Sequence, residues 1–266
     1  MRHSFRNAWA IAWLAGFLTS VTVAADFAGY PRLDRQAVLQ KLAQPGPNGK
    51  PEIYAANLSG VDLSGVDFRG ANLSASVFNK AKLTGARLDR CNLTVSFLEG
   101  ADLTDASLRD AVLFSAQLAG ANLKGADLQG VRLIGDLRRA DLSGARLMNA
   151  KAAADMRNQS MGLMRVALTN GKAIEADFSD ADFSRADFSF ADLSRAKMQR
   201  TKLHRAEFSG AVLAGADLTG ADLTEAVLID TDLSGAKLTR ADFTGATFRN
   251  VKGLDTALKD GARGLP

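Results

Sequence analysis

The sequence has few of the side chains from which most enzyme active sites and metal centres are built. Among its 266 residues there are one cysteine, Cys91, and two histidines. A single cysteine cannot close an internal disulfide, so we expect the fold to depend on packing and hydrogen bonding alone. Cys91 and His204 are also too few for a cysteine–histidine metal cluster or a nucleophile–base pair. His204 lies next to a repeat centre and is expected to be a surface imidazole.

Aromatic residues are scarce, and neither sign of charge dominates. Aromatics make up 7% of the chain, whereas apolar residues make up 47%. This combination predicts a narrow, regular interior rather than a broad core. The formal net charge is +4, and without the first 25 residues the chain has 31 basic and 29 acidic residues. Such a balance favours neither a nucleic-acid binder nor an acidic mimic of nucleic acid.

The first twenty-five residues have the pattern of a secretory signal peptide. Arg2 and Arg6 supply a positive start, Ala8–Leu18 is an uncharged apolar run, and Val23–Ala25 places small residues where signal peptidase cleaves. We therefore expect cleavage after Ala25 and a periplasmic or secreted mature protein.

An uncleaved anchor in the inner membrane is the alternative to cleavage. Residues 8–25 carry no charge over eighteen positions, which is the lower limit for spanning a bilayer. No second apolar run of this length follows in the sequence.

A five-residue repeat dominates the rest of the chain. A large apolar residue recurs every five positions in three runs, Leu58–Leu133, Leu137–Leu147 and Phe178–Phe248. The thirty-four centres of these runs are all Leu or Phe except Met198. One residue is lost between the first two runs, and the third run begins after an interruption.

The position two residues before each centre is small. Alanine fills it in twenty-five of the thirty-four units, and Cys91 fills it in one. A period of five matches neither a helix nor a flat strand, but it fits a coil that turns a corner at every unit. In a unit such as residues 216–220, Ala216 and Leu218 then point inward and the other three residues face water. Cys91 is accordingly expected to be buried and inert.

This pattern resembles the pentapeptide-repeat family over Ala56–Arg249. The resemblance implies an all-β fold, a right-handed quadrilateral β-helix in which four units form one coil of twenty residues. Thirty-four units then give about eight and a half coils. Centres twenty residues apart, such as Phe188, Phe208, Leu228 and Phe248, are expected to stack in columns.

The repeat divides the chain into six segments. These are a signal peptide at 1–25, an N-terminal helix and linker cap at 26–55, a first solenoid part at 56–149, a degenerate coil or loop insertion at 150–175, a second solenoid part at 176–250, and a C-terminal cap and tail at 251–266.

Two of these segments invite a more detailed prediction. The cap helix is expected over Leu33–Gln44 with Asp34 as its N-cap. The interruption is either a bulge or short loop near Ala153–Ser160 or a helix over Ala150–Met164.

The outward positions contain three candidate functional features. Asp177, Asp182, Asp187 and Asp192 recur at five-residue spacing, but successive units lie on different faces, so they are expected to diverge and hold no metal. Hydroxyls at Ser64, Thr84 and Thr104 form a ladder typical of ice or glycan binding, which Lys124 interrupts. A basic run is the third feature; it comprises Arg185, Arg195, Lys197, Arg200, Lys202 and Arg205.

The basic run admits two interpretations. Arg185 and Arg205 are one coil apart and should stack, which is unfavourable unless acids relieve the repulsion. Asp180, Asp182 and the other acids nearby in sequence, Asp187 and Glu207, favour an ordinary mixed-charge surface. The alternative is a patch that faces an anionic partner or membrane.

The sequence as a whole predicts a non-catalytic exported protein. It is expected to be a protein-interaction or structural scaffold in the periplasm or cell envelope, without catalytic, cofactor-binding or metal-binding residues. Its partner would be an unknown protein or envelope component, with a homodimer possible, and neither nucleic acid nor a small-molecule substrate is expected. The alternative is that the protein binds gyrase by mimicking DNA. The resemblance implies this alternative because some members of the family have that activity.

Overall fold

The computed structural model describes residues 27, 29–46, 48–154 and 164–266. The chain divides into two compact units, Met1–Tyr30 and Pro31–Pro266. The fold described below is that of the second unit. The predicted signal peptide lies outside the described residues.

The described residues of the second unit form one helix and four short strands. The helix α1 spans Arg35–Leu42. The strands are β1 (Val112–Gln117), β2 (Arg132–Asp136), β3 (Val227–Ile229) and β4 (Thr247–Arg249). Strand β1 pairs in parallel with β2, and β3 pairs in parallel with β4.

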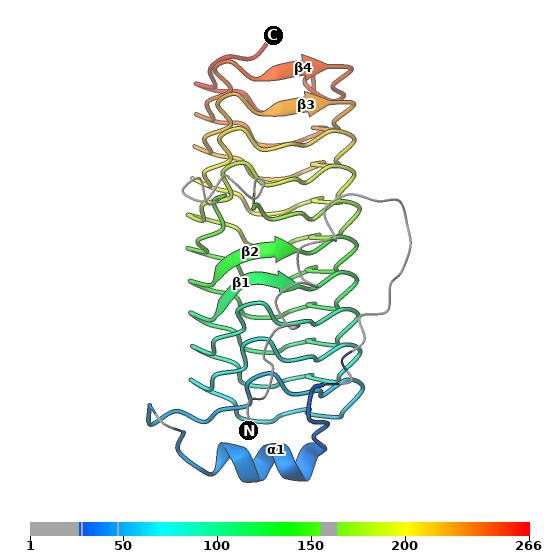
Figure 1. The fold of residues 1–266 in the computed structure, drawn as a ribbon. Coiled ribbons are helices and arrows are strands. Elements are labelled where there is room, and N and C mark those ends of the chain that lie inside the picture. Colours follow the sequence, from blue (N-terminus) through cyan, green and yellow to red (C-terminus); the bar gives the residue numbers. More distant parts are fainter. Residues whose placement is uncertain (1–26, 28, 47, 155–163) are drawn as a thin grey trace. The chain divides into compact units, whose positions relative to one another are not determined.

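Most of the chain between these strands pairs through isolated parallel bridges. Asp177 pairs with Lys197, Lys197 with Asp217, and Asp217 with Lys237, so that each step advances twenty residues. Four such series run through the unit, and successive coils therefore lie one on the next (Figure 1). The predicted count of four five-residue units per coil agrees with this spacing.

Each unit turns its corner by the same local structure. In the first regular unit the backbone N–H of Val61 donates to the carbonyl of Leu58, and Gly60 between them has φ +70°. The Asn57 side chain accepts from the backbone N–H of Ser59 at 3.0 Å. Asp or Asn before the centre thus satisfies a backbone donor at the corner, which explains its recurrence in the sequence.

The interior is filled by the repeat's own inward residues. The Leu, Phe and Ala positions from Leu58 to Phe243 are almost completely buried. The Phe188 and Phe208 rings, one coil apart, stack with centroids 5.2 Å apart and planes 9° apart. This confirms that centres twenty residues apart form columns.

Polar residues that replace the inward alanine are satisfied by one recurring bond. Ser96, Thr201 and Thr231 are fully buried, and their hydroxyls donate to the carbonyls of Leu73, Phe178 and Phe208 at 2.8–2.9 Å. In every case the acceptor lies twenty-three residues earlier, at a centre of the preceding coil. A small hydroxyl can therefore enter the core without leaving a buried donor unpaired.

The residue lost after Leu133 is the one that would make a corner. Ile134 is followed directly by Gly135, and the pairing of β1 with β2 shifts between Phe114 and Ala116 to absorb the loss. The next bridges advance nineteen residues instead of twenty, as in Asn122 with Asp141. A Cβ on Gly135 would overlap the backbone carbonyl of Ala116, so glycine is required at this position.

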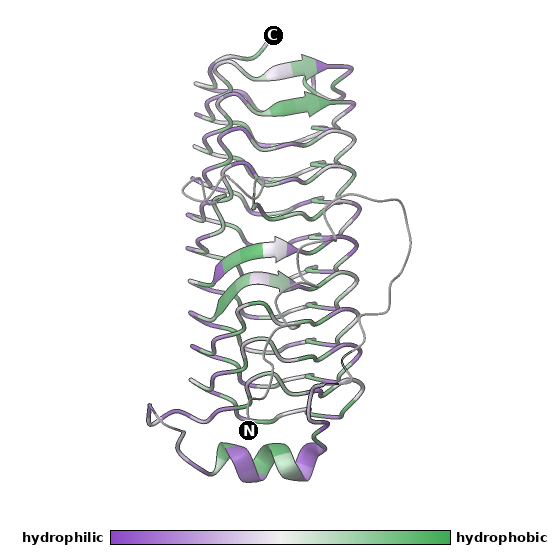
Figure 2. Ribbon diagram, viewed as in Figure 1, coloured by the Kyte–Doolittle hydropathy of each residue, from purple (hydrophilic) through white to green (hydrophobic). Residues whose placement is uncertain are grey.

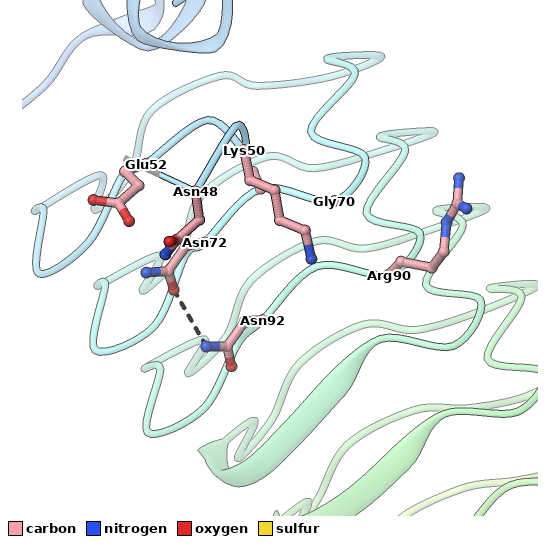
Figure 3. A pocket seen from close by; sticks show the side chains of 8 residues that line it. Asn48, Lys50, Glu52, Gly70, Asn72, Arg90 and Asn92 are labelled. Atoms are coloured by element: carbon pink, nitrogen blue, oxygen red, sulfur yellow. Dashed lines mark hydrogen bonds between the residues drawn. The ribbon is translucent and has the colours of Figure 1, made fainter. Parts of the chain in front are cut away.

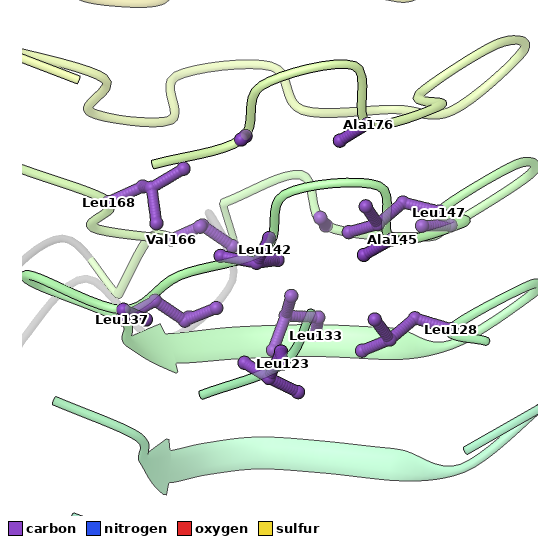
Figure 4. Packing of buried hydrophobic residues seen from close by; sticks show 14 of the residues in the cluster. Leu123, Leu128, Leu133, Leu137, Leu142, Ala145, Leu147, Val166, Leu168 and Ala176 are labelled. Carbon is purple, nitrogen blue, oxygen red and sulfur yellow. The ribbon is translucent and has the colours of Figure 1, made fainter. Parts of the chain in front are cut away.

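The core continues across the interruption that follows. Lys151 pairs with Asp182, an advance of thirty-one residues, so eleven extra residues lie between these two coils. Leu137 nevertheless stacks beneath Leu168 in the buried core (Figure 4). Residues 155–163, where both predictions for the interruption largely fall, lie outside the described residues.

On the flanks of this gap the repeat is regular. Ala167 pairs with Asp187 and Lys172 with Asp192, so regular coils are present before residue 176, where the second solenoid part was predicted to begin. Arg165 connects the segment after the gap to the next two coils, because its guanidinium forms ion pairs with Asp187 at 3.0 Å and with Glu207 at 2.7 Å.

Helix α1 is four residues shorter than predicted, two at each end, but it has the expected N-cap. Asp34 is the N-cap, and its side chain accepts from the backbone N–H of Ala37 at 2.8 Å. Val38 is fully buried in the same hydrophobic cluster as the repeat centres. No helix within the described ranges has the length and apolar character needed to cross a membrane.

The inward assignment predicts that Ala216 cannot be enlarged. Ala216→Leu places three extra carbons in a filled interior, and we expect it to lower the free energy of unfolding by about 1–3 kcal/mol in chemical denaturation. The matched control is Ala214→Leu, since Ala214 is a partly exposed alanine in the neighbouring unit. Equal stability of the two variants would contradict the assignment.

Candidate interaction surface

The outward side chains form four columns that run from coil to coil. Each column consists of the residues that precede the centres and pair with one another through the bridges. One column, for example, contains Asn72, Asn92, Val112, Arg132 and Lys151 in succession. The side chains that neighbour one another on the outer surface are therefore those twenty residues apart, and not those adjacent in sequence.

The basic run is largely neutralised by acids in adjacent coils. Three ion pairs connect residues exactly one coil apart in the run or at its edge: Arg195 with Glu175 at 2.9 Å, Arg200 with Asp180 at 2.6 Å, and Arg205 with Glu225 at 2.5 Å. The hydrogen bond to Arg200 lowers the pKa of Asp180. This supports the mixed-charge interpretation of the run.

The acids that relieve the run differ in part from those expected. Asp180 and Asp182 do pair with the run, Asp182 with Lys202 at 3.8 Å. Asp187 and Glu207 pair with Arg165 instead. The sequence-based prediction missed Glu175 and Glu225 because it considered only acids close in sequence, whereas these ion-pair partners lie one coil away.

The four regularly spaced aspartates lie in four different columns. Asp177 pairs with Lys197, Asp182 with Lys202, Asp187 with Glu207 and Asp192 with Val212. Asp182 and Asp192 each accept a hydrogen bond from the serine hydroxyl two residues later. Each of these carboxylates therefore accepts hydrogen bonds within its own turn. Among the described residues no group of His, Cys, Asp or Glu is arranged to hold a metal ion.

Neither candidate nucleophile or base lies in a reactive setting. The Cys91 thiol is buried and donates to the carbonyl of Phe68 at 3.1 Å. Burial raises the pKa of Cys91 to about 12, which keeps the thiol protonated. The Nδ1 atom of His204 lies 2.8 Å from the Thr224 hydroxyl, one coil away on the partly exposed surface.

The hydroxyl ladder is engaged in bonds within the molecule. The Thr84 and Thr104 hydroxyls both donate to the Asp102 carboxylate, at 3.1 and 2.6 Å. The Asn122 amide donates to Asp102 and to the Thr104 oxygen. These hydroxyls do not present the regular array of free donors that ice binding would use.

A shallow hollow lies beside the first coils. Lys50 and Arg90 line it together with the Asn72–Asn92 pair, in which the Asn92 amide donates to Asn72 at 3.3 Å (Figure 3). The carboxylate of Glu52 also lines the hollow and offsets one of the two cations. The hollow is therefore polar without a strong preference for anions.

Sequence reasoning missed one surface feature, which we call the β1–β2 strip. It comprises Val95, Val112, Phe114 and Ile134, which are partly or fully exposed apolar residues at outward positions. The signal was present in the sequence, because Phe114 and Ile134 stand where most units have Ser, Thr or a charged residue.

The sequence of this chain matches the family profile of pentapeptide repeats in eight copies. The matches cover residues 56–94, 98–133, 163–200, 191–228 and 206–245. The chain belongs to the pentapeptide-repeat family. Proteins of this family form right-handed quadrilateral β-helices, and they are generally structural or interaction proteins rather than catalysts.

Solved structures of pentapeptide-repeat proteins are similar to this chain. One is HetL, a protein involved in the regulation of heterocyst differentiation in the cyanobacterium Nostoc sp. strain PCC 7120. It is 29% identical, with 86% of this chain and 98% of HetL covered and a TM-score of 0.38.

A second similar structure is a trypsin-treated variant of QnrB1, a plasmid-mediated fluoroquinolone resistance protein. It is 19% identical, with 80% of this chain and 90% of QnrB1 covered and a TM-score of 0.52, a likeness that shows the fold alone. No curated protein matches the chain.

The corner aspartates of this pentapeptide-repeat protein predict a loss of stability in acid. Hydrogen bonds from the following Ser or Thr lower the pKa of Asp62, Asp102, Asp232 and Asp242. Carboxyls with a lowered pKa in the folded state contribute stability above their unfolded value of about 3.9 and lose it as the pH falls further. We therefore expect the melting temperature to drop below about pH 4.

The same four positions provide the control. Asn keeps the oxygen that accepts the corner hydrogen bond, as Asn57 does naturally. The fourfold Asp→Asn variant should fold normally and show a smaller loss between pH 5 and pH 2, whereas the fourfold Asp→Ala variant should be less stable at every pH. An unchanged acid transition in the Asn variant would refute the assignment.

Proposed function

We propose that this chain is a non-catalytic, exported interaction protein that binds another protein or an envelope component through its outer faces, in the periplasm or outside the cell. One observation carries the proposal: the interior is filled by the chain's own Leu, Phe and Ala side chains, from Leu58 to Phe243. Because the interior is filled, a partner can bind only at the outward columns. Membership of a family of structural and interaction proteins supports the same role.

The surroundings of the candidate reactive groups support a role without catalysis. A nucleophile needs an activating base or a lowered pKa. The buried Cys91 has a raised pKa instead. His204 is hydrogen-bonded to a threonine hydroxyl rather than to a carboxylate that would orient it as a base.

The fold proposed for this role is a closed right-handed solenoid with protected ends. An open end coil exposes core residues and unpaired backbone groups, so repeat proteins need caps. Val38 of α1 is buried in the core cluster, and the Arg35 guanidinium donates to the carbonyls of Asp62 and Ser64 at 3.0–3.2 Å. We assign α1 as the N-terminal cap on these contacts.

The opposite end is assigned to the C-terminal segment. Lys252 pairs with Asp232, and Leu258 pairs with Lys237. These bridges pair residues 251–266 with the last coil, and on these contacts we assign the segment as the second cap.

Export is supported by the sequence of the first twenty-five residues. The positive start at Arg2 and Arg6, the apolar run and the small residues before Asp26 are what a signal peptide requires. Cleavage after Ala25 would release the mature protein, and retention of the segment would anchor it to the inner membrane.

Site-specific photo-crosslinking in intact cells tests export and binding together. A photoreactive residue is placed in the full chain at one position on each of the four columns: Lys82, Arg87, Asn92 or Gln117. We expect a crosslinked complex from at least one column, recovered in the periplasmic or envelope fraction, with Asp26 at the new N-terminus of the protein.

Two outcomes would contradict the proposal. Uncleaved protein confined to the cytoplasm would refute export. Absence of a crosslink from all four columns would refute binding through the outer faces.

A crosslink to gyrase, with inhibited supercoiling in the presence of the purified protein, would favour DNA mimicry. The balanced surface charges do not support that alternative.

A further inference from the structure

The β1–β2 strip interrupts a polar surface that runs along the column of Asn72, Asn92 and Val112. In the preceding two coils the position after the centre is Ser74 and Thr94, but in the next two it is Phe114 and Ile134, which pair directly across the strands. Val112 also faces outward from β1. In Figure 2, β1 begins in hydrophobic colour, and β2 has hydrophobic colour between a hydrophilic start and a pale arrowhead.

Two cations with no ion pair among the described residues adjoin these apolar side chains. Arg132 follows Val112 in its column, Lys151 follows Arg132, and both are exposed. Within the part of the chain that the structure describes, neither forms an ion pair, although Lys202 in the same column pairs with Asp182. Directly adjacent like charges are destabilising. Asp182 follows Lys151 in the column, but its ion pair is with Lys202, so no ion pair among the described residues relieves the repulsion between Arg132 and Lys151.

Backbone strain occurs at the edge of the same strip. Val95 has φ +57° and is 37% exposed. The left-handed conformation is costly for residues with a Cβ and most unusual for β-branched ones. Glycine and unbranched residues both occupy the equivalent corners, as at Gly60 and Arg90, and Val95 is the only β-branched residue with a positive φ among the described residues. An apolar side chain kept on the surface at this cost is typical of a functional position.

We propose that the β1–β2 strip, with Arg132 and Lys151, is the docking surface for a segment of a partner protein that carries both acidic and large apolar side chains. Carboxylates of such a segment would relieve the repulsion between the two cations, and its apolar side chains would cover Phe114 and Ile134. This proposal rests on the proposed function, because it names the surface and the chemistry of the partner for the same binding role.

Fluorescence anisotropy with three labelled twelve-residue peptides tests the assignment on the full-length protein. One peptide alternates glutamate with leucine, the second alternates lysine with leucine, and the third alternates glutamate with serine. The glutamate–leucine peptide should bind about tenfold or more tightly than the other two, and its affinity should fall with salt. Equal affinities for the three peptides would overturn the proposal.

Charge reversal supplies the matched variants. Arg132→Glu with Lys151→Glu should weaken binding of the glutamate–leucine peptide at least tenfold and make the lysine–leucine peptide the better ligand. Lys82→Glu with Lys172→Glu makes the same change in net charge at equivalent positions of another column and should leave binding unchanged. An equal loss in both double variants would overturn the assignment, since binding would then follow net charge.

Apolar variants separate docking from folding. Phe114→Ser with Ile134→Ser should lower the affinity at least tenfold while thermal melting remains cooperative. Val95→Gly relieves the left-handed strain, so it should raise the melting temperature and weaken binding at the same time. Unchanged peptide affinity in both variants would overturn the role of the apolar side chains.

Other occupants of the strip would give different results, and each would overturn the proposal. Peptide binding that appears only after residues 155–163 are replaced by a Gly-Ser linker of equal length would assign the strip to the chain's own segment. A dimer in sedimentation that the Arg132→Glu, Lys151→Glu variant disrupts would assign it to a second copy. If the photo-crosslinks in intact cells persist in the Arg132→Glu, Lys151→Glu variant, the strip is not the docking surface, although the proposed function is still supported.

Discussion

The parallel backbone pairing between coils is the interaction on which the rest of the structure depends. In the regular coils it brings each residue against the residue twenty positions later, as Asp177 meets Lys197, and this spacing requires four equal corners per coil. Each regular corner is a turn that contains a left-handed residue, and in many units an Asp or Asn side chain accepts a backbone hydrogen bond there, as Asn57 does. The five-residue period follows from this geometry, and so does the alternation of a small and a large residue inside. The interior thus has no room for chemistry of its own.

Function is left to the outer columns by this arrangement. Some charges there form ion pairs one coil away, as in Arg200 with Asp180, and pairs of this exposed kind contribute little stability. The β1–β2 strip adds apolar side chains to this surface. It combines the loss of one corner residue before Gly135 and a strained Val95 with two adjacent cations, Arg132 and Lys151, that form no ion pair within the described residues. Apolar side chains beside two such cations are the features that a partner would recognise.

The sequence predicted the periodic features well because they depend on local rules. The centres, the small inward residues, the columns such as Phe188 with Phe208 and the N-cap Asp34 all follow from spacing or capping. The ion-pair partners were predicted only in part, since proximity along the chain is a poor guide when neighbours stand twenty residues away. The strip was missed although Phe114 and Ile134 are twenty residues apart, the spacing at which residues stack, because the outward positions were examined for charged and hydroxyl side chains and not for apolar ones.

The most direct test of the central claim is to remove one coil. Deletion of Ala206–Glu225 takes out twenty residues and joins Arg205 to Ala226, which preserves the register of corners and centres. Deletion of the eighteen residues from Phe208 to Glu225 breaks it. Thermal melting followed by circular dichroism should show a cooperative transition for the twenty-residue deletion and none of comparable sharpness for the shorter one. Equal behaviour of the two deletions would contradict the dependence of the fold on twenty-residue pairing.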